Sequence, residues 1–140
     1  MLMFEGILLD THAFLWLMNG DDILDLSIRD LIKEISREGY MAISSISIWE
    51  IAMLQNKGRI SLSQPIDRWM DKATASPLIK IINVDKSIAL ESCQLPGEFH
   101  GDPADRFIVA TARLLSIPLM TRDKKILDYS AQDYIKTIPC

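Results

Sequence analysis

The sequence has no long apolar run and few cysteines, and each shortage narrows what the chain can be. No stretch approaches the roughly 18 consecutive apolar residues that cross a bilayer, so we expect no membrane-spanning helix. The first apolar stretch is interrupted by Glu5 and follows no basic region, which argues against a cleaved signal peptide. Cys93 and Cys140 match no metal-ligand spacing, which predicts reduced thiols in a cytoplasmic protein.

The sequence also lacks an excess of positive charge. Its formal net charge is −4, which disfavours binding of nucleic acid over a broad basic face. Two divalent cations would add +4 and bring the charge of −4 to zero, with the positive charge placed where a phosphodiester would sit. The glycine-rich phosphate-binding, dinucleotide-binding and serine-hydrolase motifs are absent as well.

The chain has the length and composition of one soluble globular domain. Its 140 residues are enough for a sizeable core, and 49% of them are hydrophobic while 24% are charged. No internal repeat, low-complexity tract or linker interrupts the sequence. We therefore expect a single domain over residues 1–140.

Short apolar runs alternate with stretches of helical periodicity. The apolar runs predict strands at 6–9, 41–44, 79–84, 119–121 and 135–138. Helices are predicted at 12–18, at 28–38 with Ser27 as its cap, at 48–56, 66–73 and 103–115, with a short helix near residue 89 and a turn at 124–127. This alternation predicts an α/β fold whose mostly parallel sheet of about five strands is covered by helices on both faces.

Four acidic residues occupy similar places in this pattern. Asp10 and Asp123 come just after apolar runs, and Glu50 and Asp105 are expected in the first turn of a helix. In open α/β sheets, ligands bind beyond the carboxyl ends of the strands. The predicted topology could therefore bring these four side chains together at one edge of the sheet.

Each acid also has a purely structural interpretation. Asp10 can cap the helix that follows it, because aspartate is a favoured N-cap residue. Ser47 and Glu50 have the S-x-x-E spacing of a capping box, in which the glutamate bonds the N-cap amide. Asp85 follows an apolar run too, which shows that an acid at the end of a strand can have no special purpose.

The remaining acids could also be capping residues. Asp102, Pro103 and Asp105 read as the N-cap, first and third positions of a helix, and both acids suit its positive end. Asp123 could cap the turn that follows it. Two carboxylates as close as Asp102 and Asp105 would nonetheless repel each other unless a cation lay between them.

Convergence of four or five carboxylates would require divalent cations. Oxygen ligands without a cysteine or histidine cluster favour Mg²⁺ or Mn²⁺ over Zn²⁺. Such a site fits hydrolysis of a phosphodiester, in which metal activates water and stabilises the departing oxygen.

These residues stand in segments that resemble the PIN-domain family, and specifically its VapC-like toxin ribonucleases. The resemblance spans nearly the whole chain in the right order. The matching segments are 7–12, 44–52, 100–106 with 108–112, and 118–123, with 57–60 and 95–96 also fitting.

The resemblance implies a Rossmann-like three-layer sandwich and cleavage of single-stranded RNA, often tRNA or ribosomal RNA. It also implies a homodimer and inhibition by a cognate antitoxin protein. The implied metal-binding and catalytic acids are Asp10, Glu50, Asp105 and Asp123, with Asp102 as an adjacent acid and Thr11 and Thr121 as supporting hydroxyls. Under this hypothesis Glu50 binds metal or helps to deprotonate the attacking water.

Further side chains are candidates for contacts with the substrate. Basic residues near the acidic edge could contact phosphates. These candidates are Arg106, Arg122, Lys124 and Lys125, together with His100 in a glycine-flanked loop.

Other apolar and aromatic residues are assigned to packing. Trp16, Trp69 and Met70 are predicted to lie in the core. The apolar faces of helices 28–38 and 66–73 could be dimer surfaces or could equally be core.

Two other functions are consistent with parts of the pattern. A phosphatase with Asp10 as nucleophile would need an acid two residues later, where this chain has His12. A module that binds metal or a partner without catalysis would use the same scaffold, although the four acids would then need another explanation.

Overall fold

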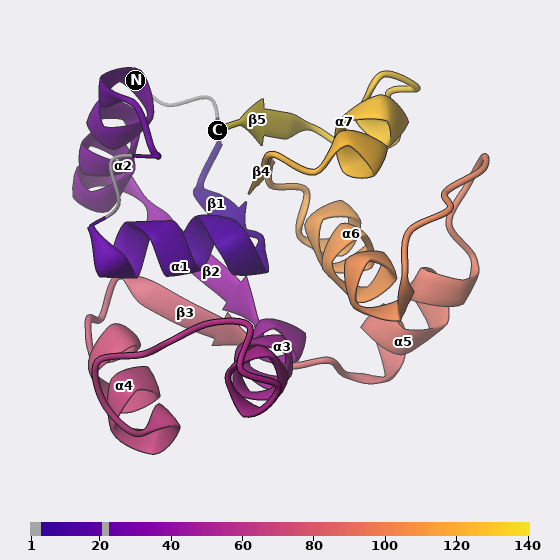
Figure 1. Ribbon diagram of the computed structural model, residues 1–140. Helices are drawn as coiled ribbons and strands as arrows, with labels where there is room; N and C mark the ends of the chain where they lie inside the picture. The colour runs from indigo at the N-terminus through magenta and orange to yellow at the C-terminus, as the bar shows by residue number, and fades with distance from the viewer. Residues whose placement is uncertain (1–3, 21–22) are drawn as a thin grey trace.

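Five parallel strands form the central sheet of the computed structural model, which describes residues 4–20 and 23–140 (Figure 1). The strands are β1 (Gly6–Leu9), β2 (Tyr40–Ser44), β3 (Ile79–Ile82), β4 (Leu119–Thr121) and β5 (Thr137–Pro139). Their order across the sheet is β3-β2-β1-β4-β5, and each neighbouring pair is parallel. All carboxyl ends therefore lie at the same edge, and the predicted α/β fold is confirmed.

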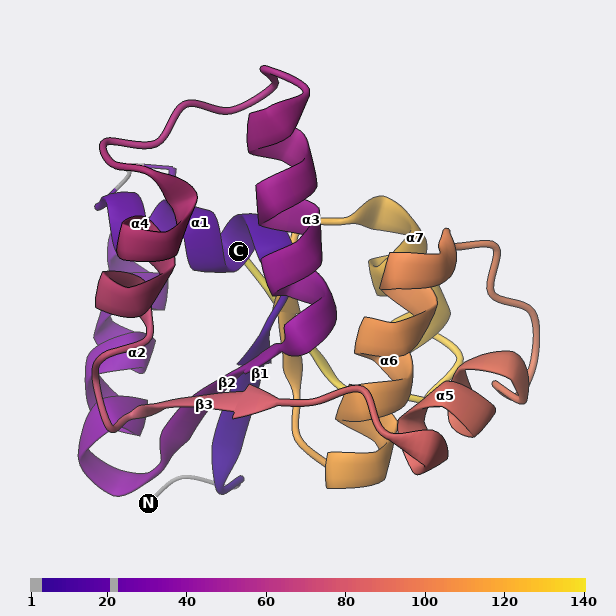
Figure 2. The ribbon, with the colours of Figure 1, turned by 90° about the horizontal axis from the view of Figure 1, so that it is seen from below.

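The strands divide the hydrophobic core into two clusters because successive side chains point to opposite faces of a sheet. Ile7 and Leu9 belong to the first cluster, whereas Leu8 between them belongs to the second. The first cluster takes its helical residues from α1, α2, α3 and α4, and the second from α6 and α7. Figure 2 shows these two helical layers on either side of the sheet. The expected three-layer sandwich is confirmed.

Aspartate caps begin most of the helices that the structure describes. The helices are α1 (Thr11–Asn19), α2 (Leu26–Glu38), α3 (Ser45–Asn56), α4 (Ile66–Ala73), α5 (Lys86–Cys93), α6 (Pro103–Leu115) and α7 (Lys124–Ser130). In five of them an aspartate side chain accepts a backbone N–H of the first turn: Asp10, Asp25, Asp85, Asp102 and Asp123. Such a bond satisfies one of the amides that a helix leaves unpaired at its start.

Some predicted boundaries were wrong for local reasons. Asp25, rather than Ser27, caps α2, and the Ser27 hydroxyl donates to Asp25 Oδ1 at 2.7 Å. Strand β3 ends before Val84 because the Val84 amide donates to Ser45 Oγ at 3.0 Å instead of pairing with a strand. Residues 124–130 form a helix where a turn was expected, and β5 lies at Thr137–Pro139 rather than 135–138.

The apolar faces of α2 and α4 are core rather than open surface. Ile28, Ile32 and Ile35 of α2 are buried in the first cluster, as are Trp69 and Met70 of α4. This confirms the prediction for Trp69 and Met70, and these faces are not available for a dimer. Across residues 4–20 and 23–140, no helix combines the length and the apolar character that crossing a membrane requires.

Candidate active site

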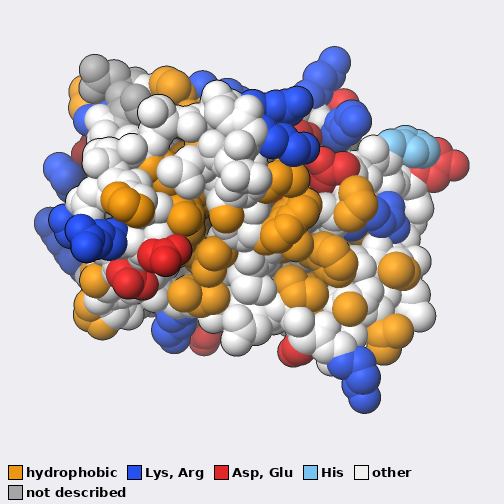
Figure 3. All heavy atoms as spheres, turned by 60° about the horizontal axis from the view of Figure 1, so that its bottom comes forward, with side chains coloured by type: hydrophobic (Ala, Val, Ile, Leu, Met, Phe, Trp, Pro, Cys, Tyr) orange, Lys and Arg blue, Asp and Glu red, His pale blue; other side chains and the backbone are white. Residues whose placement is uncertain are grey.

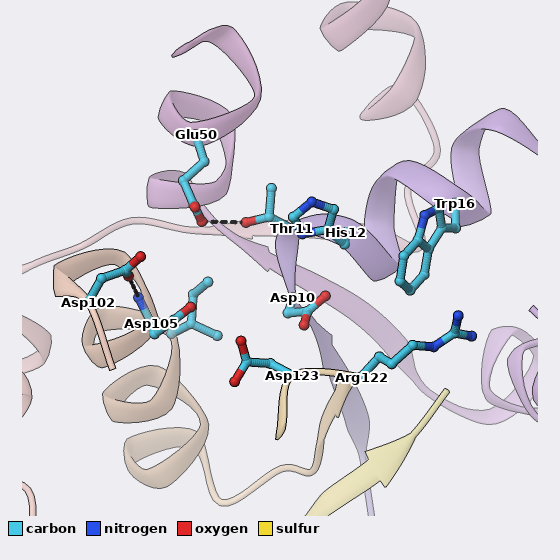
Figure 4. Close-up of a pocket in the computed structure, with 10 residues that line it drawn as sticks. Asp10, Thr11, His12, Trp16, Glu50, Asp102, Asp105, Arg122 and Asp123 are labelled. Atoms are coloured by element: carbon cyan, nitrogen blue, oxygen red, sulfur yellow. Dashed lines mark hydrogen bonds between the residues drawn. The ribbon is translucent and has the colours of Figure 1, made fainter. Parts of the chain in front are cut away.

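A pocket of about 290 Å³ opens at the carboxyl edge of the sheet, where β1 and β4 end side by side. Five carboxylates line it: Asp10, Glu50, Asp102, Asp105 and Asp123. They come from the ends of β1 and β4 and from helices α3 and α6, and Figure 4 shows them around one space. The other lining residues are Thr11, His12, Trp16, Ile108 and Arg122. The structure thus brings together all five acids that the sequence singled out.

Asp10 caps α1 and lines the pocket at the same time. Its Oδ1 accepts the Ala13 amide at 2.8 Å, and its Oδ2 accepts the Thr121 hydroxyl. The residue is only 9% exposed. Burial raises the pKa of Asp10, and the hydrogen bonds from Thr121 and Ala13 oppose that shift. The orientation of the Asp10 carboxylate is therefore fixed by one hydrogen bond to each of its oxygens.

Thr121 ties two of the acids together. Its hydroxyl is fully buried at the end of β4, where it donates to Asp10 and accepts the Asp123 amide at 3.0 Å. Asp123 in turn caps α7, because its Oδ1 accepts the Ile126 amide at 3.1 Å. A single hydroxyl thus links the carboxylate after β1 to the backbone of the carboxylate after β4.

The capping-box interpretation of Glu50 was wrong because α3 begins earlier than predicted. Ser44 is the N-cap residue, and its hydroxyl accepts the Ile46 amide at 3.1 Å. Ser47 therefore lies inside the helix and Glu50 in its second turn, where it cannot reach back to an N-cap amide.

Glu50 is instead held by a neighbouring helix. The Thr11 hydroxyl donates to Glu50 Oε1 at 2.6 Å and also lies 2.9 Å from Ser47 Oγ (Figure 4). Burial raises the pKa of Glu50, the bond from Thr11 opposes the shift, and the charges of Asp102 and Asp10 add to it. Both predicted supporting hydroxyls, Thr11 and Thr121, thus contact an acid of the pocket.

The start of α6 supplies the remaining two acids as predicted. Asp102 is the N-cap residue and accepts the Asp105 amide at 2.9 Å, with Pro103 at the first helical position. Burial and the charges of the four other acids raise the pKa of Asp105 from 3.8 to about 7. The five acids that line the pocket outnumber its basic residues, so the negative charge of the pocket is not fully neutralised by the side chains around it.

The order of these residues along the chain corresponds to a known family. Residues 7–132 match the sequence pattern of the family described as PIN domain. The chain belongs to the PIN-domain family. It is 30% identical over 120 residues to Ribonuclease VapC22 of Mycobacterium tuberculosis, which covers 86% of this chain and 88% of that protein. This relationship places the chain among the VapC-like members.

Solved structures share the same fold. VapBC2 from Rickettsia felis, bound to a DNA fragment from its promoter, has a TM-score of 0.69 with 16% identity, covering 96% of this chain and 98% of the other. A toxin–antitoxin complex from Klebsiella pneumoniae has a TM-score of 0.61 with 23% identity, covering 94% and 95%. At these identities the likeness shows the fold of this PIN domain and not its partners.

Arg122 is the basic candidate that lines the pocket of this PIN domain. Its Nε donates to the carbonyl of Cys140, and its Nη2 donates to the carbonyl of Ile23 at 3.1 Å. The guanidinium carbon also lies 4.6 Å from the centre of the Trp16 ring. These contacts hold the charge beside the acids without pairing it to them.

The other basic candidates lie elsewhere. Arg106 donates to the backbone carbonyls of Ser92 and Phe99 at 2.9 and 2.7 Å, so its guanidinium braces the segment before α6. It is not part of the pocket lining. The same holds for Lys124, Lys125 and His100.

The sequence interpretation missed three residues of the pocket: His12, Trp16 and Ile108. Trp16 was assigned to the core, but it is only partly buried and lines the pocket together with His12, whose ring centre is 5.9 Å away. The sequence could have indicated this, because His12 and Trp16 stand four residues apart on the helix that Asp10 caps. That spacing places both on the same helical face.

The donor set fits a hard divalent cation, although the pocket is open rather than a closed cage. Carboxylate oxygens dominate the lining, and oxygen donors are those that Mg²⁺ and Mn²⁺ prefer. Within residues 4–20 and 23–140, no three acidic, histidine or cysteine side chains are close enough to hold an ion as they stand. This spacing still suits a cation such as Mg²⁺, which is usually held by one or two carboxylates and keeps several of its water molecules.

Proposed function

We propose that this protein is a metal-dependent endoribonuclease that hydrolyses RNA phosphodiester bonds as the toxin of a toxin–antitoxin pair. The observation that carries the proposal is the pocket of five carboxylates in a chain related over most of its length to a named ribonuclease. The proposed substrate is cytoplasmic RNA, such as tRNA or ribosomal RNA.

The proposed cofactor is Mg²⁺ or Mn²⁺. Asp10, Asp105 and Asp123 would hold it, with Asp102 as a further ligand, and Glu50 would either bind it or accept a proton from the attacking water. When bound, such a cation lowers the pKa of a water molecule and stabilises negative charge on the phosphate. Burial, and after it the charges of the other acids, raise the pKa of Asp105, and this supports the assignment because a cation would relieve the repulsion between the acids.

The protein's own residues orient the reacting groups. Thr121 and the Ala13 amide fix both oxygens of Asp10, so this ligand needs little reorganisation. Thr11 holds Oε1 of Glu50, which leaves Oε2 to accept a proton from the attacking water. Arg122 places a positive charge on the lining, where it can contact a phosphate of the RNA.

The direct test is cleavage of RNA by the purified protein, free of antitoxin. Total RNA would be incubated with the protein in Mg²⁺, in Mn²⁺ or in EDTA, beside an Asp10→Asn variant. Asparagine is also a good N-cap residue, so the variant keeps the start of α1 while losing the charge. We expect metal-dependent cleavage by the unaltered protein alone. Equal cleavage by both proteins, or cleavage in EDTA, would contradict the proposal.

The proposed protein partner is a cognate antitoxin. The structural neighbour from Klebsiella pneumoniae is described as a toxin–antitoxin complex, which supports a partner of this kind. Expression of the protein in a bacterial host should slow growth, and co-expression of the neighbouring gene product should relieve the effect. Relief without a physical complex in co-purification would argue against direct inhibition.

A homodimer is also part of the proposal, and the structure offers a surface for it. Helix α3 exposes Trp49, and hydrophobic side chains gather in the middle of the face drawn in Figure 3. The faces of α2 and α4 are excluded because they are core. Sedimentation of the protein beside a Trp49→Ser variant tests this assignment, since loss of the dimer is expected in the variant.

A further inference from the structure

One wall of the pocket is aromatic and cationic rather than acidic. His12, Trp16 and Arg122 form it, on the other side of the space from Asp102 and Asp105 (Figure 4). His12 and Trp16 lie on one face of α1, directly after Asp10. We call these three side chains the aromatic wall.

Trp16 is held firmly but keeps part of its ring accessible. It packs against the first core cluster and is only partly buried. The ring lines the acidic pocket and also a second hollow of about 240 Å³ between α1 and α2. A large ring that is fixed on one side and open on another suits the binding of a flat ligand.

Arg122 lies over one face of this ring and adds a charged guanidinium group to the surface. Its guanidinium lies over the Trp16 ring at 4.6 Å and is fixed by the carbonyls of Cys140 and Ile23. Nucleobases of single-stranded RNA stack on aromatic rings and on arginine planes. A phosphate next to such a base would meet the positive charge of the same guanidinium.

We propose that the Trp16–Arg122 pair is the stacking platform for one nucleobase beside the phosphodiester that is cleaved. The inference rests on the proposed nuclease function and names the residues that would hold an unpaired nucleotide at the cut. Base pairing would hide both faces of the base in a duplex stack. Trp16 then binds substrate with the part of its ring that does not pack against the core.

The position of the wall favours RNA over a protein partner as its ligand. Trp16 shares one pocket with the five carboxylates, so a phosphate positioned there brings its own base within reach of the ring. The charges around the pocket also suit a nucleotide. A metal ion bound by the acids and the guanidinium of Arg122 could both neutralise its phosphate.

The test compares Trp16→Phe and Trp16→Leu with the unaltered protein. Two measurements are made on short single-stranded RNAs: kcat/KM in Mn²⁺, and affinity by fluorescence anisotropy in Ca²⁺. We expect Trp16→Leu to lower kcat/KM and affinity by roughly 5- to 100-fold, the range for loss of one base–aromatic stack, and Trp16→Phe to retain most of both. Tyr134→Leu is the matched control, because Tyr134 is an exposed aromatic residue that lines a different pocket.

An abasic scan separates stacking from a merely structural effect. Each nucleotide around the cut is replaced in turn by an abasic site, and one position should weaken cleavage by the unaltered protein and by Tyr134→Leu. The same replacement should leave Trp16→Leu unchanged, since that variant has already lost the stack. A general loss of folding would lower the rate at every position alike and would not produce this pattern.

The outcomes distinguish this inference from the nuclease proposal. Cleavage that is metal-dependent but shows equal abasic sensitivity in Trp16→Leu overturns the stacking platform and leaves the nuclease intact. Trp16-dependent RNA binding without any cleavage supports the platform and overturns the nuclease. If no RNA binds, or if Trp16→Leu weakens only a complex with a protein partner, the platform is overturned.

Discussion

Helix α6 has a pocket at each end, and the two pockets differ in charge rather than in size. The pocket at its start measures about 290 Å³ and holds five carboxylates. The pocket at its end measures about 330 Å³ and is lined by Arg113, Lys136 and Asp133 among uncharged residues. Arg113 there pairs with Glu91 at 3.0 Å and donates to the Tyr134 carbonyl at 2.6 Å.

The difference shows what marks a functional site in this fold. At the amino edge of the sheet, the positive charge of Arg113 is already paired with Glu91, and its guanidinium also donates to the Tyr134 carbonyl. At the carboxyl edge, burial together with the charges of the four other acids raises the pKa of Asp105 to about 7. Charge that the protein leaves uncompensated, rather than the volume of a hollow, therefore points to the active site.

The largest expected effect is a loss of RNA cleavage. It is expected for acids that both cap a helix and line the pocket, and not for an acid that only caps a helix. Asp10→Asn and Asp123→Asn should each lower the RNA cleavage rate by roughly 100-fold or more, because a charged ligand is lost while the cap is kept. Asp85→Asn is the matched control, since Asp85 caps α5 through the Ile88 amide at 2.9 Å and lies outside the pocket. A comparable loss in Asp85→Asn would show that capping, not metal binding, explains the effect.

A smaller loss is expected when the orientation of a ligand is disturbed. Thr121→Val keeps the buried volume but removes the hydroxyl that donates to Asp10, so cleavage should fall by roughly 10- to 100-fold. Thr121→Ser should restore most of the rate. Thr111→Val serves as the control, because the buried Thr111 hydroxyl donates within α6 to the Phe107 carbonyl at 2.7 Å. Equal losses in the two valine variants would argue against orientation of Asp10 as the cause.

The pH dependence of stability should follow from Asp105. Its pKa rises from 3.8 to about 7 on folding, so between these values the folded state binds more protons than the unfolded state. The metal-free protein should therefore lose stability as the pH rises from about 4 to about 7, and change little above that range.

Thermal unfolding in EDTA across this pH range measures the effect. Asp105→Asn should flatten the dependence and raise the melting temperature at pH 8 by a few degrees, as roughly 1 kcal/mol would. Saturating Mn²⁺ should raise the stability of the unaltered protein most at high pH. A melting temperature that increases steadily from low to high pH in EDTA would contradict this account of the pocket.

The smallest effect on activity is expected at the other end of α6. Arg113→Met removes the ion pair with Glu91 and the bond to the Tyr134 carbonyl. Stability should fall by about 1 kcal/mol, measured by urea denaturation, because a partly exposed pair contributes little. RNA cleavage should remain within about twofold of the unaltered protein. A loss as large as that of Asp10→Asn would remove the distinction between the two pockets.

Much of the fold could be predicted because its signals are local. A continuous apolar run such as 6–9 indicates a buried strand, and Asp102-Pro103 marks the start of a helix by its own chemistry. The errors were local as well. Ser47 and Glu50 had the spacing of a capping box, but the chain had already turned into a helix at Ser45.

The sequence predicted the acidic residues of the site but not its aromatic residues. The acids stood out because carboxylates after apolar runs are poorly explained by packing. Trp16 did not stand out, because a large ring at helical spacing is usually core, and part of its surface does pack there. Arg106 was a reasonable phosphate contact by position, and only its bonds to Ser92 and Phe99 show otherwise.

The sequence by itself determined most of the strands and helices and the capping positions of Asp10, Asp102 and Asp123, because apolar periodicity and capping depend on residues only a few positions apart. Tertiary structure decided which of those aspartates share a site. Strand β1 lies next to β4, so Asp10 and Asp123 meet at one pocket, whereas β3 lies two strands from β1 and leaves Asp85 outside it. Strand order depends on contacts between distant segments, and these decide where each carboxylate finds its neighbours.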